Sequence, residues 1–251
     1  MAQQEGIIKL KGKIGDLTFY KTKSGYQARE AKGVDPNRIA NDPNFKRTRE
    51  NGAEFGRACR AGKLFRTVFK PLSQQFQDSY MSTRLVKAMI KAIQADAINE
   101  RGLRTILDAE AELLTGFEFN SNGSVSSTLS VPYSSAIDRA LGNAQISLPA
   151  FSAKDMVAAP GGATHFKFTA AAAVINFETG AYEIDIKESA LDAVNSMSIP
   201  AQNLGCSLSP ASSGPIFLLL GISFYQRVNS YDYPLSNGSF NGLSVVLVAG
   251  T

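Results

Sequence analysis

The spacing of apolar residues changes character near Gly116, and this change most constrains the fold. Between about residues 43 and 97, apolar residues recur at three- and four-residue steps, as in amphipathic helices. After Gly116, short apolar runs alternate with clusters of Gly, Ser, Asn and Pro, as in β-strands joined by tight turns. The two patterns predict an α+β protein, with an N-terminal domain over residues 1–115 and a C-terminal domain over residues 116–251.

The first thirty residues predict a small β-ribbon. Turn signals at Gly12, Gly15-Asp16 and Ser24-Gly25 separate its short β-prone runs. These runs are Ile7–Leu10, Leu17–Tyr20 and Tyr26–Arg29. A ribbon of this size is marginal in isolation, so it must dock on its own helices or on a neighbouring subunit.

Two or three helices, including a helical hairpin, are predicted to follow the ribbon. Asp42 and Pro43 are a helix-start signal, because the carboxylate can cap free N–H groups and proline suits the first helical position. The first predicted apolar stripe comprises Phe55, Ala58, Cys59, Gly62, Phe65 and Phe69. A second helical stretch runs from about Leu72 to Ala97, with Leu85, Met89 and Ile93 at four-residue steps.

The region after Gly116 predicts an antiparallel β-sandwich, because it holds six or more short strand candidates with turns between them. The main candidates are Ser126–Val131, Gln145–Leu148, His165–Phe177, Gly180–Lys187, Pro215–Val228 and Leu243–Val248. Within Tyr182–Lys187, apolar and charged residues alternate, so one face of that strand is expected to meet water.

Charge is divided unequally between the two regions. Residues 1–115 hold 21 Lys and Arg against 13 Asp and Glu, a net charge of +8, whereas residues 116–251 hold 5 against 9, a net of −4. The basic positions of greatest interest are Arg47, Arg49, Arg57, Arg60, Lys63 and Arg66. They fit a solvated helix face, an interface with an acidic surface of a second copy, or a nucleic-acid contact.

No arrangement of residues in the sequence predicts catalysis, so the chain is expected to be non-enzymatic and to need no cofactor or metal. His165 is the only histidine, and Cys59 and Cys206 lie far apart, so neither a histidine-rich zinc site nor a four-ligand cysteine cluster can form. Neither glycine-rich segment, Gly12–Gly15 or Gly161–Thr164, has P-loop spacing. Both cysteines are expected to be small buried apolar residues.

One aromatic and polar segment is a possible binding patch for a glycan or a protein. It comprises Tyr225, Arg227, Tyr231 and Tyr233. Packing at strand ends would equally account for these tyrosines.

Several short stretches resemble a family of uncharacterised proteins from Bacteroidota. In the N-terminal region these are Gly6–Gly12, Gly15–Tyr20, Arg47–Asn51 and Glu54–Gly56, and in the C-terminal region Gly116–Asn120 and Ala163–Lys167. The resemblance spans most of the chain and implies that the two regions occur together as one architecture. It implies no activity and no site residues.

The sequence is not expected to insert into a membrane. Its first residues lack a signal-peptide core, and its longest apolar run, Ile216–Ile222, is far shorter than a membrane span. We expect synthesis in the cytoplasm, with an extracellular final location if the protein assembles into a particle that is released.

The favoured functional hypothesis is a structural protein that self-assembles into a filament, tube or shell, with other copies of itself as partners. Subunits would meet through the ribbon, through edge strands and through opposite charges. The predicted assembly residues are Ile7, Ile8, Leu10, Leu17, Phe19, Tyr20 and Tyr26. The alternatives are a basic module that associates with nucleic acid, and a sandwich that binds a glycan or a protein.

Overall fold

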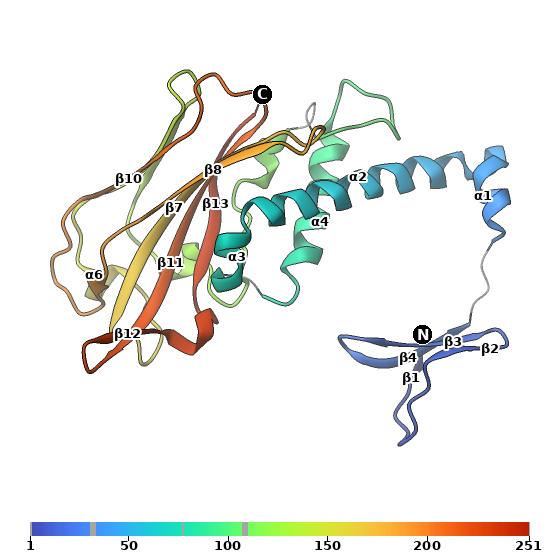
Figure 1. Ribbon diagram of the computed structural model, residues 1–251, viewed down its shortest axis with the longest axis horizontal. Coiled ribbons are helices and arrows are strands. Elements are labelled where there is room, and N and C mark those ends of the chain that lie inside the picture. The colour runs from blue at the N-terminus through green and yellow to red at the C-terminus, as the bar shows by residue number, and fades with distance from the viewer. Residues whose placement is uncertain (1, 31–33, 77, 107–109, 251) are drawn as a thin grey trace. The chain divides into compact units, whose positions relative to one another are not determined.

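The computed structural model describes residues 2–30, 34–76, 78–106 and 110–250, which fall into two compact units (Figure 1). The first unit ends at Arg49 and the second begins at Glu50. The predicted α+β class is confirmed, with a small N-terminal sheet, several helices and a curled antiparallel C-terminal sheet. The predicted boundary between residues 115 and 116 falls inside the second unit, where helices and strands share one core.

The first unit is built around a four-stranded antiparallel sheet with the strand order β1-β4-β3-β2. Its elements are β1 (Ala2–Gln3), β2 (Gly12–Ile14), β3 (Leu17–Thr22), β4 (Gly25–Glu30), α1 (Pro36–Asn41) and the 3-10 helix η1 (Pro43–Phe45). Ile7–Leu10, predicted as a strand, instead lies in the connection between β1 and β2. The predicted helix start is confirmed, because the Asp42 side chain caps η1 by accepting from the Asn44 backbone N–H at 2.9 Å.

The helix α2 (Lys46–Val68) begins in the first unit and continues in the second. The helical elements that follow are α3 (Lys70–Phe76), α4 (Met81–Ala95), η2 (Ala111–Leu114), α5 (Val125–Thr128), α6 (Ala153–Met156) and η3 (Leu235–Gly238). The strands are β5 (Ser134–Asp138), β6 (Asn143–Leu148), β7 (His165–Ile175), β8 (Tyr182–Glu188), β9 (Asp192–Ala193), β10 (Gln202–Ser207), β11 (Ile216–Val228), β12 (Tyr231–Pro234) and β13 (Gly242–Ala249). The predicted strand Ser126–Val131 is therefore corrected, because Ser124 caps a short helix there.

Strands β7 and β11 pair along their length and form the centre of a six-stranded sheet. Their side chains alternate between two cores. Phe168, Ala172 and Leu218 face a three-stranded sheet with the order β10-β6-β5, whereas Ala173 and Phe217 face the helices. Because both faces of β7 and β11 are covered, these strands are almost continuously apolar.

Helices α2, α3 and α4 cover one face of this sheet (Figure 1). The predicted stripe on α4 is confirmed, since Leu85, Met89 and Ile93 are all fully buried. On α2 the stripe is narrower than predicted, because Phe65 is buried while Phe55 is 55% exposed. The second unit therefore has three layers, with helices, a central sheet and a smaller sheet.

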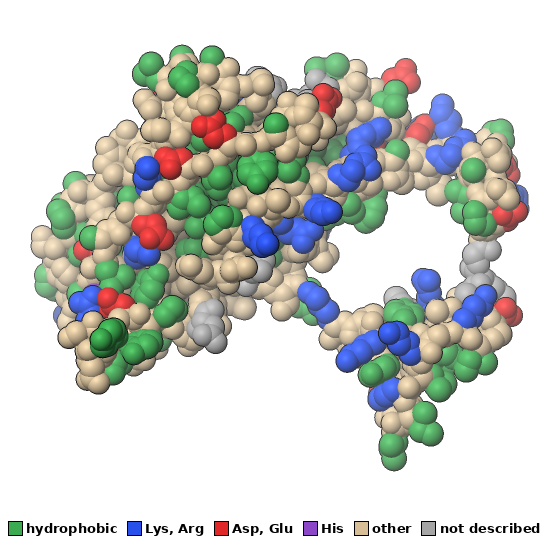
Figure 2. Space-filling view, in the orientation of Figure 1, with side chains coloured by type: hydrophobic (Ala, Val, Ile, Leu, Met, Phe, Trp, Pro, Cys, Tyr) green, Lys and Arg blue, Asp and Glu red, His purple; other side chains and the backbone are tan. Residues whose placement is uncertain are grey.

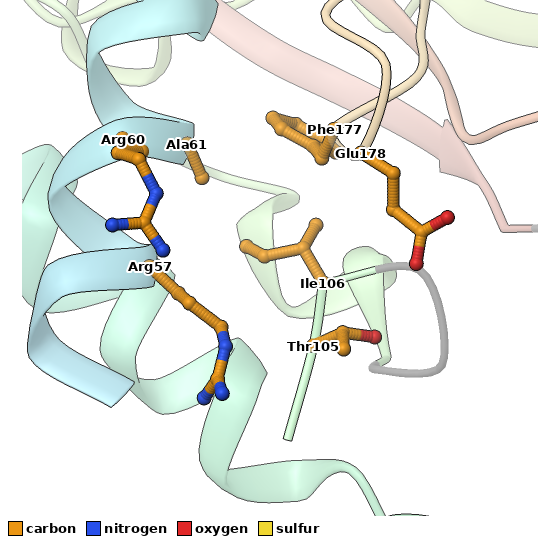
Figure 3. Close-up of a pocket in the computed structure, with 7 residues that line it drawn as sticks. All are labelled: Arg57, Arg60, Ala61, Thr105, Ile106, Phe177 and Glu178. Carbon is orange, nitrogen blue, oxygen red and sulfur yellow. The ribbon is translucent and has the colours of Figure 1, made fainter. Parts of the chain in front are cut away.

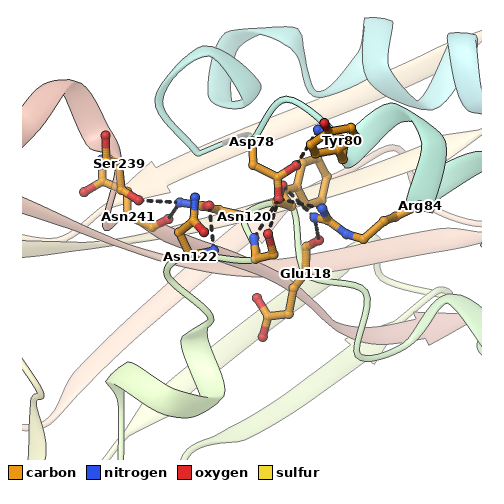
Figure 4. A network of polar contacts seen from close by, with 10 residues as sticks. Asp78, Tyr80, Arg84, Glu118, Asn120, Asn122, Ser239 and Asn241 are labelled. Carbon is orange, nitrogen blue, oxygen red and sulfur yellow. Dashed lines mark hydrogen bonds and ion pairs between the residues drawn. The ribbon is translucent and has the colours of Figure 1, made fainter. Parts of the chain in front are cut away.

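A buried carboxylate joins the helices to the sheet (Figure 4). Asp78 lies between α3 and α4, and its Oδ2 accepts from Arg84 Nη1 at 2.5 Å and from the backbone N–H of Ser121 at 2.8 Å. Arg84 also donates to the carbonyl oxygens of Glu118 at 2.9 Å and Phe119 at 3.2 Å. These bonds fix the chain that runs beside β13.

Two asparagines continue this network (Figure 4). The Asn120 amide donates to the carbonyl oxygens of Ser239 at 3.0 Å and Asn241 at 2.9 Å. The Asn241 amide oxygen accepts from the backbone N–H of Phe224 at 3.0 Å, and its NH₂ group donates to the Gln75 carbonyl oxygen at 3.2 Å. Three segments that are distant in sequence are thereby held together.

Replacing Gly142 with alanine is expected to destabilise the protein more than the same change at Gly180. Both glycines have positive φ, +72° and +78°, so alanine costs about 1–2 kcal/mol of backbone strain at either site. A β-carbon at Gly142 would also lie 2.1 Å from the Leu208 carbonyl oxygen, whereas none of the described atoms lies within 4 Å at Gly180. Urea unfolding should show a further loss of about 1–3 kcal/mol for Gly142→Ala. Equal losses would contradict the close approach.

Candidate functional surfaces

The N-terminal sheet has one apolar face. Cross-strand partners project from the same face of a sheet. On β3, Leu17 pairs with Ile14 of β2 and Phe19 pairs with Ala28 of β4, so these four side chains share one face. Tyr26 joins this face through its pairing with Lys21, whose ammonium lies 5.5 Å from the centre of the tyrosine ring. The apolar face is defined as Ile14, Leu17, Phe19, Tyr26 and Ala28.

The structure brings together only some of the predicted assembly residues. Leu17, Phe19 and Tyr26 share the apolar face, while Tyr20 lies on the opposite face under the guanidinium of Arg29. The remaining three, Ile7, Ile8 and Leu10, are exposed in the connection between β1 and β2. Sequence reasoning missed Ile14, although the turn at Gly15-Asp16 implies that it pairs with Leu17.

The described part of the first unit has no core of its own. Within its described residues, 2–30 and 34–49, none is buried. A four-stranded sheet normally needs a hydrophobic face packed on another layer to be stable. Ile14 is 61% exposed and Leu17 is 45% exposed, so the apolar face is available to another protein surface.

The cations on the N-terminal sheet and its first connection are also exposed. Residues 1–49 hold eleven Lys and Arg against five Asp and Glu, a net charge of +6. Those on the sheet and its first connection are Lys9, Lys11, Lys13, Lys21, Lys23 and Arg29, all of them exposed. The sheet therefore combines an apolar face with a positive potential.

An acidic strip lies along the edge strand β8 of the second unit. Residues 178–192 contain five acids and one base, a net charge of −4, which equals the whole negative excess of residues 116–251. The β8 acidic strip is defined as Glu178, Glu183, Asp185, Glu188 and Asp192. It offers an acidic complement to the N-terminal sheet.

Hydrogen bonds hold several of these carboxylates in place without neutralising them. Glu183 accepts from the backbone N–H of Ser209 at 3.0 Å, and Asp185 accepts from that of Ser207 at 2.9 Å. Burial raises the pKa of Asp185, but the hydrogen bond from Ser207 and the ion pair with Lys187 outweigh it and leave the pKa below its ordinary value. Asp185 therefore stays ionised at neutral pH.

The predicted basic positions lie along α2, where Lys and Arg side chains gather in Figure 2. Three of them donate to carbonyl oxygens of their own chain: Arg49 to Ile39, Arg57 to Gly102 and Arg66 to Gly62. Arg47, Arg60 and Lys63 are exposed. Half of the predicted cations thus stabilise the fold.

Two of these arginines line a pocket of about 290 Å³ (Figure 3). Arg57 and Arg60 form one wall, and Glu178 lies on the other side near Phe177. The Arg57 guanidinium is already bonded to the Gly102 carbonyl oxygen at 2.7 Å. Charges of both signs face this pocket, so its chemistry does not select one class of ligand.

The structure splits the predicted tyrosine patch between two faces of the β11–β12 hairpin. Val228 pairs with Tyr231 and Gln226 pairs with Tyr233, so these tyrosines project to one side. Tyr225 and Arg227 project to the other side, where Arg227 forms a bidentate ion pair with Asp232 at 2.6 and 2.9 Å. Four residues close in sequence therefore do not form one surface.

The histidine and the two cysteines lie apart from one another in the fold. His165 begins β7, with its Nδ1 2.9 Å from the Thr164 hydroxyl oxygen. Cys206 is buried as predicted, and burial raises the pKa of its thiol to about 11. Cys59, on α2, is only half-buried.

Comparison of the sequence with protein-family models and with curated proteins gave no match. The described residues contain no group of three His, Cys, Asp or Glu side chains arranged to hold a metal ion. Across the described part of the chain, no helix has both the length and the apolar character needed to cross a membrane.

Proposed function

We propose that the protein is a non-enzymatic structural subunit that self-assembles, with the N-terminal sheet of one copy docking on the β8 acidic strip of the next. One observation carries this proposal: the described part of the first unit has a four-stranded sheet and no buried residue. Such a sheet gains stability only when another surface covers its apolar face.

Burial and charge both favour this contact. Each aliphatic side chain removed from water contributes about 1.5–3 kcal/mol, and Ile14, Leu17 and Ile8 are all available for burial. Association itself costs at least about 4 kcal/mol, so several such side chains must be covered together. The +6 unit and the −4 strip add attraction and orient the encounter.

Contacts of this kind are head to tail, because two different surfaces of the same chain meet. Repeating such a contact produces closed rings or open helical polymers. A filament, tube or shell is therefore the expected product. The nucleic-acid alternative has less support, because Arg49, Arg57 and Arg66 are engaged within the chain.

Exchange of charges tests the contact directly. Lys13→Glu/Lys21→Glu lowers the net charge of residues 1–49 from +6 to +2, and Glu178→Lys/Glu188→Lys brings the strip from −4 to zero. Each variant alone is expected to assemble less than the unaltered protein by light scattering and negative-stain microscopy at low salt, since the attraction between the two surfaces is reduced. In an equimolar mixture the two variants should pair, because the unaltered strip of the first meets the unaltered sheet of the second.

The control is Lys70→Glu/Lys154→Glu, which changes the net charge equally at exposed positions outside both surfaces. It should assemble like the unaltered protein. A natural chain that remains monomeric at high concentration would rule the proposal out, and so would failure of the two variants to pair when the control assembles.

A further inference from the structure

An apolar groove of about 630 Å³ lies between α2 and α4. Its walls include apolar side chains that the core leaves partly open, since Phe55 is 55% exposed and Val86 and Ile90 are half-buried. The α2–α4 groove is lined by Phe55, Cys59, Ser82, Thr83, Val86, Lys87, Ile90, Lys91 and Gln94. All of these residues belong to the second unit.

The groove exists because α4 has two stripes. Leu85 and Met89 form the stripe that is buried against the sheet. Val86 and Ile90, one position further along, lie at the same four-residue spacing on an adjacent face. At the floor the helices pack closely, since a β-carbon at Gly62 would lie 3.4 Å from Val86. The second stripe therefore remains open.

The shape of the groove matches a helix. Its lining on α4 extends from Ser82 to Gln94, which corresponds to about 18 Å or three turns of helix. Amphipathic helices bind in such grooves through apolar residues at i, i+3 or i+4, and i+7. A third helix placed here would complete a layer of packed helices and cover Phe55 and Ile90.

The surroundings of the groove are cationic. Residues 55–95 contain eight Lys and Arg and a single acid, Asp78, which is bound to Arg84 and Ser121. Lys87 and Lys91 line the groove itself and are exposed. An occupant with acidic residues beside its apolar stripe would be attracted, and a basic one would be repelled.

We infer that the α2–α4 groove binds an acidic amphipathic helix of a different protein. The surfaces of a second copy do not fit, because α2 and α4 are basic and the N-terminal sheet carries net positive charge. The β8 acidic strip lies on an edge strand, which does not supply a helix. The groove is thus a docking site in addition to the proposed assembly contact.

A pair of synthetic peptides tests this inference on the full-length protein. The first is a helical peptide of about 15 residues with leucines at helical spacing and glutamates beside them. The second has every glutamate replaced by lysine. Fluorescence anisotropy is expected to show at least about tenfold tighter binding of the acidic peptide. Lys87→Glu/Lys91→Glu should reverse the preference, and Val86→Asp/Ile90→Asp should weaken binding at least about tenfold.

Reactivity of Cys59 reports where the peptide binds. A thiol reagent at pH 8 should modify Cys59, which lines the groove, and not the buried Cys206. Bound acidic peptide should protect Cys59. Equal affinity for the two peptides would overturn the inference, as would failure of both to bind. Protection by anionic phosphatidylglycerol vesicles alone, or protection that depends only on protein concentration, would also overturn it, because the occupant would then be a lipid surface or a second copy.

Discussion

Replacing Phe65 with alanine is expected to lower the free energy of unfolding by about 3–5 kcal/mol, because the change leaves a cavity within a cluster of aromatic rings. Phe65 is fully buried, and its ring centre lies 4.8 Å from that of Phe69 and 5.1 Å from that of Phe217. It also stacks on Phe119 at 5.9 Å. One side chain on α2 therefore contacts the sheet and the segment beside β13.

Thermal unfolding followed by circular dichroism should show this loss as a fall of about 6–20 °C in midpoint. Phe55→Ala is the matched control, since it is the same change on the same helix at a residue that is 55% exposed. Its effect is expected to stay within about 1 kcal/mol. Similar losses for the two variants would contradict the distinction between a buried and an open part of the α2 stripe.

These two phenylalanines also show what helical periodicity predicts and what it does not. Helical spacing placed Phe55 and Phe65 on one stripe, but the buried face of α2 includes Phe65 and not Phe55. Spacing indicates which face of a helix is apolar, but it does not indicate what covers each turn of that face. The sheet covers Phe65, whereas at Phe55 no described residue buries the ring, and the α2–α4 groove results.

A strand could be predicted where its pattern of apolar and polar residues reflects which of its faces are covered. Tyr182–Lys187 alternates because it forms an edge strand, and Ile216–Phe224 is continuously apolar because both faces are covered. The three-stranded sheet was harder to predict from the sequence, since β5 has the sequence Ser-Ser-Ala-Ile-Asp and none of its residues is fully buried. The segment beginning at Ser126 was misread as a strand because four residues are too short for helical spacing to show.

Strand pairing determines which residues share a candidate surface, and composition alone does not reveal this pairing. Asn229 and Ser230 both have positive φ and form a two-residue turn, so Val228 must pair with Tyr231 and Arg227 with Asp232. This register separates the tyrosines between the faces of the hairpin. Pairing across the turn at Gly15-Asp16 likewise brings Ile14 beside Leu17. Both results follow from turn chemistry once the turn length is known.

Asp78→Asn is expected to reduce the free energy of unfolding by about 2–3 kcal/mol at neutral pH. The aspartate Oδ2 accepts from Arg84 and Ser121, while Oδ1 accepts from the backbone N–H of Tyr80 at 2.7 Å. An asparagine can present an oxygen to only one of these two sets, and its NH₂ group then meets donors. Asp155→Asn, at an exposed position, is the control and should change stability by less than about 0.5 kcal/mol.

The same carboxylate makes stability depend on pH with a definite sign. Burial raises the pKa of Asp78, but hydrogen bonds from Ser121 and Arg84 outweigh it and hold the pKa well below its ordinary value. Asp96, which accepts from the backbone N–H groups of Asn99 and Thr105, likewise has a pKa of about 2 despite its burial. A carboxyl group whose pKa is lower in the folded state than in the unfolded state adds stability at pH values above its unfolded-state pKa, which is about 4. This stability is lost as the pH falls through the folded-state pKa.

Urea unfolding between pH 2 and pH 7 should therefore show a loss of stability below about pH 4 in the unaltered protein. Asp78→Asn removes one of the groups responsible, so its curve should fall less steeply in that range. The half-buried Glu118 acts in the opposite direction, because its partial burial raises its pKa and protonation relieves the cost of burying its charge. Parallel curves for the two proteins would mean that Asp78 gains nothing from its contacts with Arg84 and Ser121.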